Sequence, residues 1–218
     1  MMELNGLQNY EEMKDKLIVS LMNYENYKET LKKTYFIKMG DIAATICIVN
    51  KAADKSAAYI LIKEVLDKYI DTVGSFSKVF LNACENTKRL YPPKTLSSPI
   101  DVIFGNFKDP YTITEIDPTG LIITNDKSFL AASSIFFPSL LKSISENAAN
   151  GNDLLISFTS VHEAIIHEFR KNVEPEKIAE AVREVNDNIN NGTNSKNFLT
   201  NKVYIYYAAQ DCVREYPM

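Results

Sequence analysis

The first regular hydrophobic pattern in the chain predicts a long helix at residues 10–33. Apolar and aromatic residues recur there every three or four positions, which places them on one helical face, while Glu and Lys occupy the opposite face. Asn9 and Glu12 have the spacing of a capping box at the start of this helix, with Asn in place of Ser or Thr. The expected buried stripe consists of Tyr10, Met13, Leu17, Leu21, Tyr24, Tyr27 and Leu31.

Two apolar runs, at residues 42–49 and 58–62, predict a β-hairpin. The polar residues KAADKS separate them, and β-branched residues such as Ile42 and Val49 favour a strand in the first run. A short helix or an irregular turn is expected next, at residues 63–70.

Ser75 marks the start of a second predicted helix, which extends to Leu90, because its hydroxyl can accept a free backbone N–H at the N-cap. Pro92 and Pro93 end this helix. The residues that follow, 94–120, are rich in proline and contain two glycines. They predict an irregular connection with one short strand at 102–104.

The second half of the chain alternates between further strands and helices. Pro138 and Pro175 each stand where the first turn of a helix tolerates proline, and Asn150 and Gly151 end the first of these helices. The predicted helices cover residues 138–148 and 175–189, and the predicted strands cover residues 121–124, 130–136, 154–158, 164–167 and 203–208.

The order of these elements favours an α+β fold. Hairpin connections outnumber parallel crossovers, so we expect a mixed, mostly antiparallel sheet, or sheets, with helices packed on one face. The chain has 218 residues, which is enough for one large domain or two small ones. We expect a single domain over residues 1–218, and residues 94–120 are where a boundary between two similar lobes would fall.

Composition and charge weigh against several classes of protein. The 28 acidic residues exceed the 24 basic ones, and nonspecific nucleic-acid binding needs a basic surface. The N-terminal residues are too polar for a signal peptide, and no apolar run approaches the ~20 residues of a membrane helix. The cysteines lie far apart and lack a CxxC spacing, which indicates a reducing compartment. We therefore expect a cytoplasmic protein that does not enter a membrane.

Ser160, His162 and Glu163 are the sharpest candidates for catalysis, because Ser, His and Glu carry nucleophilic and general acid–base chemistry. On a strand Ser160 and His162 share a face and Glu163 points away, so an acid that orients His162 would have to come from elsewhere. The alternative is a turn between two strands, in which Ser160 and His162 satisfy backbone groups or each other. The spacing favours the turn.

The sequence predicts no cofactor and no metal site. His162 and His167 stand in the segment HEAIIH, which is not the HExxH zinc motif, and on a strand they would face opposite sides of the sheet. Neither a GxGxxG motif nor a phosphate-binding P-loop is present.

Tyr204, Tyr206 and Tyr207 form a candidate interaction surface on the last predicted strand. Tyr204 and Tyr206 alternate onto one face of this strand, and Tyr207 lies on the other. Exposed tyrosines are frequent anchors at protein interfaces, and a strand at a sheet edge can also pair with a partner. The alternative is a half-buried strand whose hydroxyl groups reach solvent at the rim.

Several blocks of the chain match a known family in order and spacing. They are NYENYKETL in the first predicted helix, DIAATICIVN and AAYILI in the hairpin, ENTKRLYPP at the end of the second helix, and then ITNDKSFLAASSIFFPSLL, SFTSVHEAII and REVN. Together they resemble the bacterial domain of unknown function 5688, which is common in gut Firmicutes, over about residues 10–209. The resemblance implies that the segment from Ser160 to Glu163 is a family feature. It implies no activity.

These observations lead to the hypothesis of a non-enzymatic intracellular protein that binds another protein. A full apolar core and an aromatic C-terminal strand support it, and the chain lacks a convincing catalytic set. A narrower hypothesis is an inhibitor or counter-defence factor of a phage or mobile element. The alternative is a small hydrolase or transferase that uses His162 with Ser160.

Overall fold

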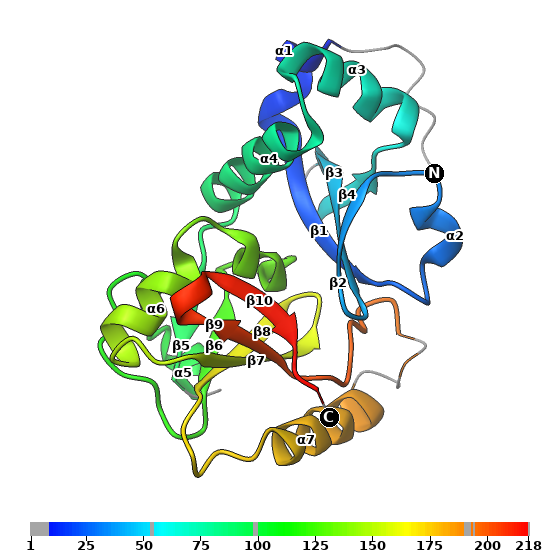
Figure 1. Ribbon diagram of the computed structural model, residues 1–218. Coiled ribbons are helices and arrows are strands. Elements are labelled where there is room, and N and C mark those ends of the chain that lie inside the picture. Colours follow the sequence, from blue (N-terminus) through cyan, green and yellow to red (C-terminus); the bar gives the residue numbers. More distant parts are fainter. Residues whose placement is uncertain (1–8, 53–54, 98–99, 190–192, 194, 218) are drawn as a thin grey trace.

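The protein is built on two antiparallel sheets, which the computed structural model describes for residues 9–52, 55–97, 100–189, 193 and 195–217 (Figure 1). The first sheet has β3 in its middle, with β1 on one side and β2 and β4 on the other. Its strands are β1 (Leu17–Asn23), β2 (Phe36–Met39), β3 (Ile42–Ala52) and β4 (Lys55–Ile60).

The second sheet has six strands in the order β10-β9-β7-β8-β6-β5. Every pairing between described strands in both sheets is antiparallel. The predicted α+β fold with mostly antiparallel sheets is thus confirmed. The strands are β5 (Lys94–Leu96), β6 (Leu121–Thr124), β7 (Leu154–Ser160), β8 (Glu163–Glu168), β9 (Tyr204–Tyr207) and β10 (Cys212–Glu215).

Helices lie beside both sheets (Figure 1). The helix α4 packs against β1, and its N-cap is Ser75, whose Oγ accepts the N–H of Lys78 at 3.3 Å, as the sequence predicted. The α-helices are α1 (Tyr10–Met13), α2 (Lys28–Leu31), α3 (Lys63–Val73), α4 (Phe76–Leu90), α5 (Ile100–Phe104), α6 (Leu140–Ala148) and α7 (Pro175–Ile189). The described residues also form the 3-10 helices η1 (Lys14–Lys16), η2 (Ala131–Phe136) and η4 (Ala208–Gln210).

The second sheet carries helices on both of its faces, where the sequence predicted one. Leu154 and Ile156 of β7 face the same buried cluster as Ile144 of α6. Leu155, the residue between them, packs in a separate cluster with Ala179 of α7. Because neighbouring strand residues point to opposite faces, α6 and α7 cover opposite sides of this sheet.

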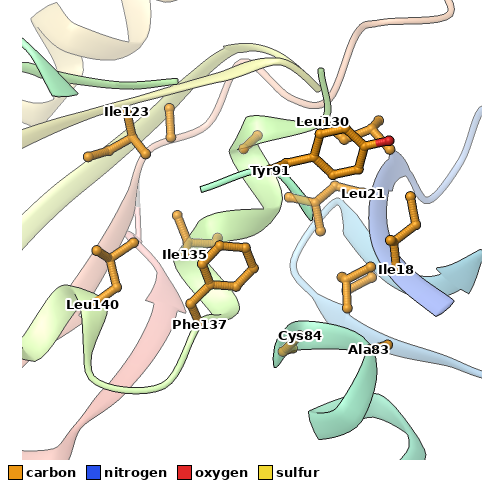
Figure 2. Packing of buried hydrophobic residues seen from close by; sticks show 14 of the residues in the cluster. Ile18, Leu21, Ala83, Cys84, Tyr91, Ile123, Leu130, Ile135, Phe137 and Leu140 are labelled. Atoms are coloured by element: carbon orange, nitrogen blue, oxygen red, sulfur yellow. The ribbon is translucent and has the colours of Figure 1, made fainter. Parts of the chain in front are cut away.

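The two sheets share one apolar core. A single cluster of buried side chains draws on both halves of the chain, and Leu21, Tyr91, Leu130 and Ile135 belong to it (Figure 2). The chain passes from the first sheet to the second after α4, just ahead of the expected range 94–120. The sheets differ in strand number and order, so the halves are not similar lobes.

Residues 10–33 do not form the predicted long helix. They form α1 and η1, then the strand β1, and then α2. All residues of β1 are buried, and Ile18 and Val19 lie between the positions of the expected helical stripe. A strand covered on both faces shows no alternation of apolar and polar residues, so its apolar run can be mistaken for part of a helix.

Two other short apolar runs were also assigned to the wrong element. Within the predicted strand 130–136, residues 131–136 form η2, and residues 102–104 belong to the helix α5. All residues from Ala131 to Ile135 are buried at the junction of the sheets, so this run has no polar face that would mark a helix. Periodicity does not distinguish such a segment from a buried strand.

Candidate functional site

Ser160 and His162 lie at the tight turn between β7 and β8, and both side chains accept hydrogen bonds from backbone N–H groups. The Ser160 Oγ accepts the N–H of His162 at 3.1 Å, and the His162 Nδ1 accepts the N–H of Leu130 at 3.2 Å. The Glu163 carboxylate accepts a hydrogen bond from the hydroxyl of Thr159 at 3.1 Å. The three candidate catalytic side chains therefore have separate hydrogen-bond partners, in the manner of the turn that the sequence favoured.

The His162 ring is in its neutral form, because its Nδ1 accepts a backbone N–H. Burial lowers the pKa of His162, and a hydrogen bond with the Asn197 side chain and the charge of Glu163 oppose this shift. The Leu130 N–H that it satisfies belongs to a residue with a φ of 52°. His162 thus holds an uncommon backbone conformation in place at the start of η2.

The other histidine does not join this turn. His167 lies near the far end of β8, its ring packs against Gly120, and burial lowers its pKa. Within the part of the chain that the structure describes, no three His, Cys, Asp or Glu side chains come together as a possible metal site.

Tyr204 and Tyr206 are buried, which removes them from the expected exposed surface. Both rings lie in the shared core, and only Tyr207 of the three is partly exposed. The strand that carries them, β9, is paired on both sides, with β7 and with β10. The strand at this edge of the second sheet is therefore β10, which the sequence did not predict.

The hydroxyl of Tyr204 instead ties the two sheets together. It accepts the N–H of Asp41 and donates to the carbonyl oxygen of Met39, each at 3.2 Å. Asp41 and Gly40 form the two-residue loop between β2 and β3. Burial raises the pKa of Tyr204, so the hydroxyl remains protonated at neutral pH.

An ion pair network holds the same loop. The Lys202 ammonium lies 2.9 Å from Asp41 Oδ1 and 2.8 Å from Glu215 Oε1, and these carboxylates raise the pKa of Lys202. A Cβ on Gly40 would lie 2.8 Å from the Tyr204 hydroxyl and even closer to Glu215 Oε2. We call Gly40, Asp41, Lys202, Tyr204 and Glu215 the junction clamp.

An open groove with a volume of about 450 Å³ extends from the junction clamp along the edges of both sheets. One wall is β2 with the loop after it, the other wall is β10, and η2 contributes part of the lining. Ile37 is 37% exposed there, although it is apolar. The groove is lined by Ile37, Lys38, Met39, Gly40, Ile135, Phe136, Val213, Arg214 and Glu215.

The β2 wall of the open groove presents unpaired backbone groups. In an antiparallel ladder, the residues between the bonded pairs direct their N–H and C=O groups to the other side of the strand. The Tyr24 N–H bonds to the Asp41 carbonyl between β1 and β3, which fixes this alternation along β3. Phe36 and Lys38 of β2 lie opposite Thr45 and Ala43, whose own N–H and C=O groups face β1. The N–H and C=O groups of Phe36 and Lys38 therefore point away from β3.

The β10 wall of the open groove also presents backbone groups that are not used in its own ladder. The Tyr216 N–H bonds to the Val203 carbonyl, and the alternation along the β9–β10 ladder then directs the backbone of Val213 and Glu215 away from β9. No described residue forms a hydrogen bond with these outward groups. Two strand edges that could each accept a further strand therefore line one groove.

The groove has an excess of positive charge. The Lys38 ammonium lies 3.7 Å from the centre of the Tyr24 ring, and Arg214 donates to the Gln210 side chain at 3.0 Å. Neither cation has a carboxylate within ion-pair distance among the described residues. Glu215, the acidic residue of the lining, is already paired with Lys202.

These features define an antiparallel, two-sheet α+β protein with an unpaired strand edge on each side of an open groove. The chain belongs to DUF5688, a family of unknown function whose model matches residues 1–208, and this confirms the resemblance noted in the sequence. Comparison with curated proteins and with solved structures gave no match. Within the described residues, no helix has both the length and the apolar character needed to cross a membrane.

Sequence reasoning missed both walls of the open groove. A signal for β2 was present, because Gly40 and Asp41 separate FIKM from IAAT and form a two-residue loop of the kind that joins hairpin strands. The short strand β10 follows a four-residue loop that ends in Asp211, whose φ is 47°. Its sequence, CVRE, offers little strand signal of its own.

Proposed function

We propose that this protein is a non-enzymatic binding protein and that the open groove is the surface on which another protein docks. The observation that carries the proposal is the pair of unpaired strand edges on opposite walls of the groove. Edge strands are templates for pairing with another chain, and an exposed apolar residue such as Ile37 adds contact area. A binding role also agrees with the separate hydrogen-bond partners of Ser160, His162 and Glu163.

A site-specific crosslinking experiment tests the proposal. A photoreactive phenylalanine analogue replaces Ile37 in the groove, and in a matched variant it replaces Leu81 of α4, which is 51% exposed. Both proteins are irradiated in the cells that produce them. We expect a discrete crosslinked species from position 37 that position 81 does not give, with the partner identified by mass spectrometry.

Two results contradict the proposal: no crosslink at position 37, or the same pattern of crosslinks at both positions. The variant His162→Asn is a further control, because the Asn side chain can still accept the Leu130 N–H but offers no imidazole. We expect it to crosslink as the unaltered protein does. An inhibitor or counter-defence role is a narrower form of the proposal, and the identity of the crosslinked protein would decide for or against it.

A further inference from the structure

The backbone and charge of the open groove indicate how a partner binds there. We infer that an extended segment of the partner, with acidic and apolar residues in alternation, adds to β10 as a further strand of the second sheet. This inference rests on the proposed function, because it needs the groove to be a protein-binding surface. It adds the conformation of the bound segment and the chemistry of its side chains.

The outward backbone of β10 supplies the pairing. Val213 and Glu215 direct their N–H and C=O groups into the groove, and two such residues suffice for a short ladder. Pairing by strand addition gives affinity through the main chain, while alternate side chains give specificity. The bound segment would therefore be extended, with its side chains alternating between the two faces of the enlarged sheet.

The inner face of the added strand meets an apolar surface. Val213 lies opposite Tyr206 in the ladder and packs against the shared core, so the inner face of β10 is the core side. Ile135 and Phe136 of η2 line the groove, and Ile37 lies on its other wall. Side chains of the bound segment that point to this side would leave water only if they are apolar.

The outer face favours acidic side chains. Arg214 lies opposite Ile205 and so points to the other side of β10 from Val213. Arg214 on this face and Lys38 on the opposite wall are the lining cations, and neither is paired with a carboxylate among the described residues. A glutamate or aspartate at alternate positions of the segment would pair with them, whereas a lysine would be repelled.

The experiment starts from a display library of random peptides selected on the intact protein. We expect the enriched peptides to alternate acidic and apolar residues. One of them is synthesised and titrated against two variants of the outward-facing position, Val213→Pro and Val213→Thr. Proline removes the N–H that the segment would use, and this N–H makes no bond to β9, so an edge strand tolerates the change. Threonine keeps the N–H and the branched shape.

We expect Val213→Pro to raise the Kd about tenfold or more, because a main-chain hydrogen bond is lost and the ring obstructs the ladder. Val213→Thr should bind like the unaltered protein. Hydrogen exchange provides a second readout that does not depend on the folding of the proline variant. The amide protons of Val213 and Glu215 should exchange rapidly in the free protein and slowly with the peptide bound.

Several results would overturn the inference. Equal binding to both variants without protection of the two amides excludes strand addition, but the proposed function stands if crosslinking at position 37 still captures a partner. Enriched peptides without acidic residues, or no enrichment, also overturn it. If sedimentation shows a dimer that Val213→Pro dissociates, a second copy of the chain occupies β10, and the assignment to a partner protein is wrong.

Discussion

The edge strands β2 and β10 line the open groove, and the two ends of this groove differ in how the strands are held. At one end, the loop after β2 is held against β9 and β10 by the Tyr204 hydroxyl and the Lys202 ion pairs, and Gly40 leaves no room for a side chain. At the other end, Ile37 is exposed, and the outward backbone groups of Lys38 and Val213 form no hydrogen bond with a described residue. Side-chain contacts of the junction clamp, and not pairing between β2 and β10, therefore hold the edges of the two sheets next to each other.

This comparison separates stability from binding. Changes in the junction clamp should lower the free energy of unfolding, because its groups are buried or paired. Changes at exposed positions of the open groove outside the junction clamp, such as Ile37, should leave that free energy almost unchanged, because these side chains contact solvent.

Gly40→Ala should be the most damaging change. The residue has a φ of 55°, and the new Cβ would meet the Tyr204 hydroxyl and Glu215. We expect the free energy of unfolding to fall by about 3 kcal/mol, from backbone strain and the forced displacement of the junction clamp. Chemical denaturation measures it.

The matched control for Gly40 is Gly151→Ala. Gly151 also has a positive φ, 78°, but a Cβ there would meet nothing within 4 Å. We expect this variant to lose only about 1 kcal/mol, which is the cost of the backbone conformation alone. Equal losses at both positions would show that the close approach of Gly40 to Tyr204 and Glu215 has no energetic weight.

Tyr204→Phe should cost about 2 kcal/mol, because it removes the hydroxyl of a buried side chain and leaves the part-buried Asp41 N–H without its acceptor. Tyr207→Phe is the control, since Tyr207 is partly exposed and its hydroxyl forms no hydrogen bond with the described residues. We expect no measurable change for it. A loss at position 204 no larger than at position 207 would contradict a role of this hydroxyl in joining the sheets.

Alkaline pH should weaken the junction clamp. The carboxylates raise the pKa of Lys202 in the folded state, so the folded protein holds this proton more tightly than the unfolded chain does. The stabilisation is complete below the unfolded lysine pKa of about 10.4 and is lost as the pH rises beyond it. Burial raises the pKa of Tyr204 and acts in the same direction.

Lys202→Met isolates the lysine contribution. At neutral pH we expect it to lower the free energy of unfolding by about 1 kcal/mol, since the three side chains are partly exposed to solvent. The decline in stability above pH ~10 should be shallower in the variant than in the unaltered protein. Parallel pH profiles, measured by thermal unfolding, would count against the ion pairs.

Ile37→Thr should have the smallest effect. The change retains the branched shape that favours a strand, and the side chain is partly in solvent, so we expect a loss within about 0.5 kcal/mol. Ile46→Thr on the neighbouring strand β3, where the side chain is fully buried, is the contrast and should cost several times more. A large loss at position 37 would mean that the groove wall is structural.

Much of the fold could be predicted from the sequence, and the exceptions have physical causes. Ser75 and the β3–β4 hairpin were found because capping and β-branched residues act locally. The strand β1 and the helix η2 were missed because all residues of β1 and all residues of η2 except Phe136 are buried, so no exposed polar face marks their periodicity.

The candidate site was harder to predict. Tyr204 and Tyr206 were correctly placed on one face of a strand, but the presence of β10 beyond them could not be known, and it turned an expected edge into an interior strand. The junction clamp joins Asp41 to Lys202. Such a contact between distant parts of the chain has no local signal, since each residue alone is an ordinary polar surface residue.

The distance along the chain between the two parts of the junction clamp also matters during synthesis. The Asn23 side chain donates to the Leu199 carbonyl, and Asp41 contacts Lys202 and Tyr204. The hairpin of β2 and β3 therefore forms these contacts only after the ribosome has added the last part of the chain. Until those residues leave the exit tunnel, the apolar face that the first sheet turns to the shared core remains uncovered, which favours aggregation. The first sheet therefore completes its packing only after the C-terminal strands of the second sheet are available.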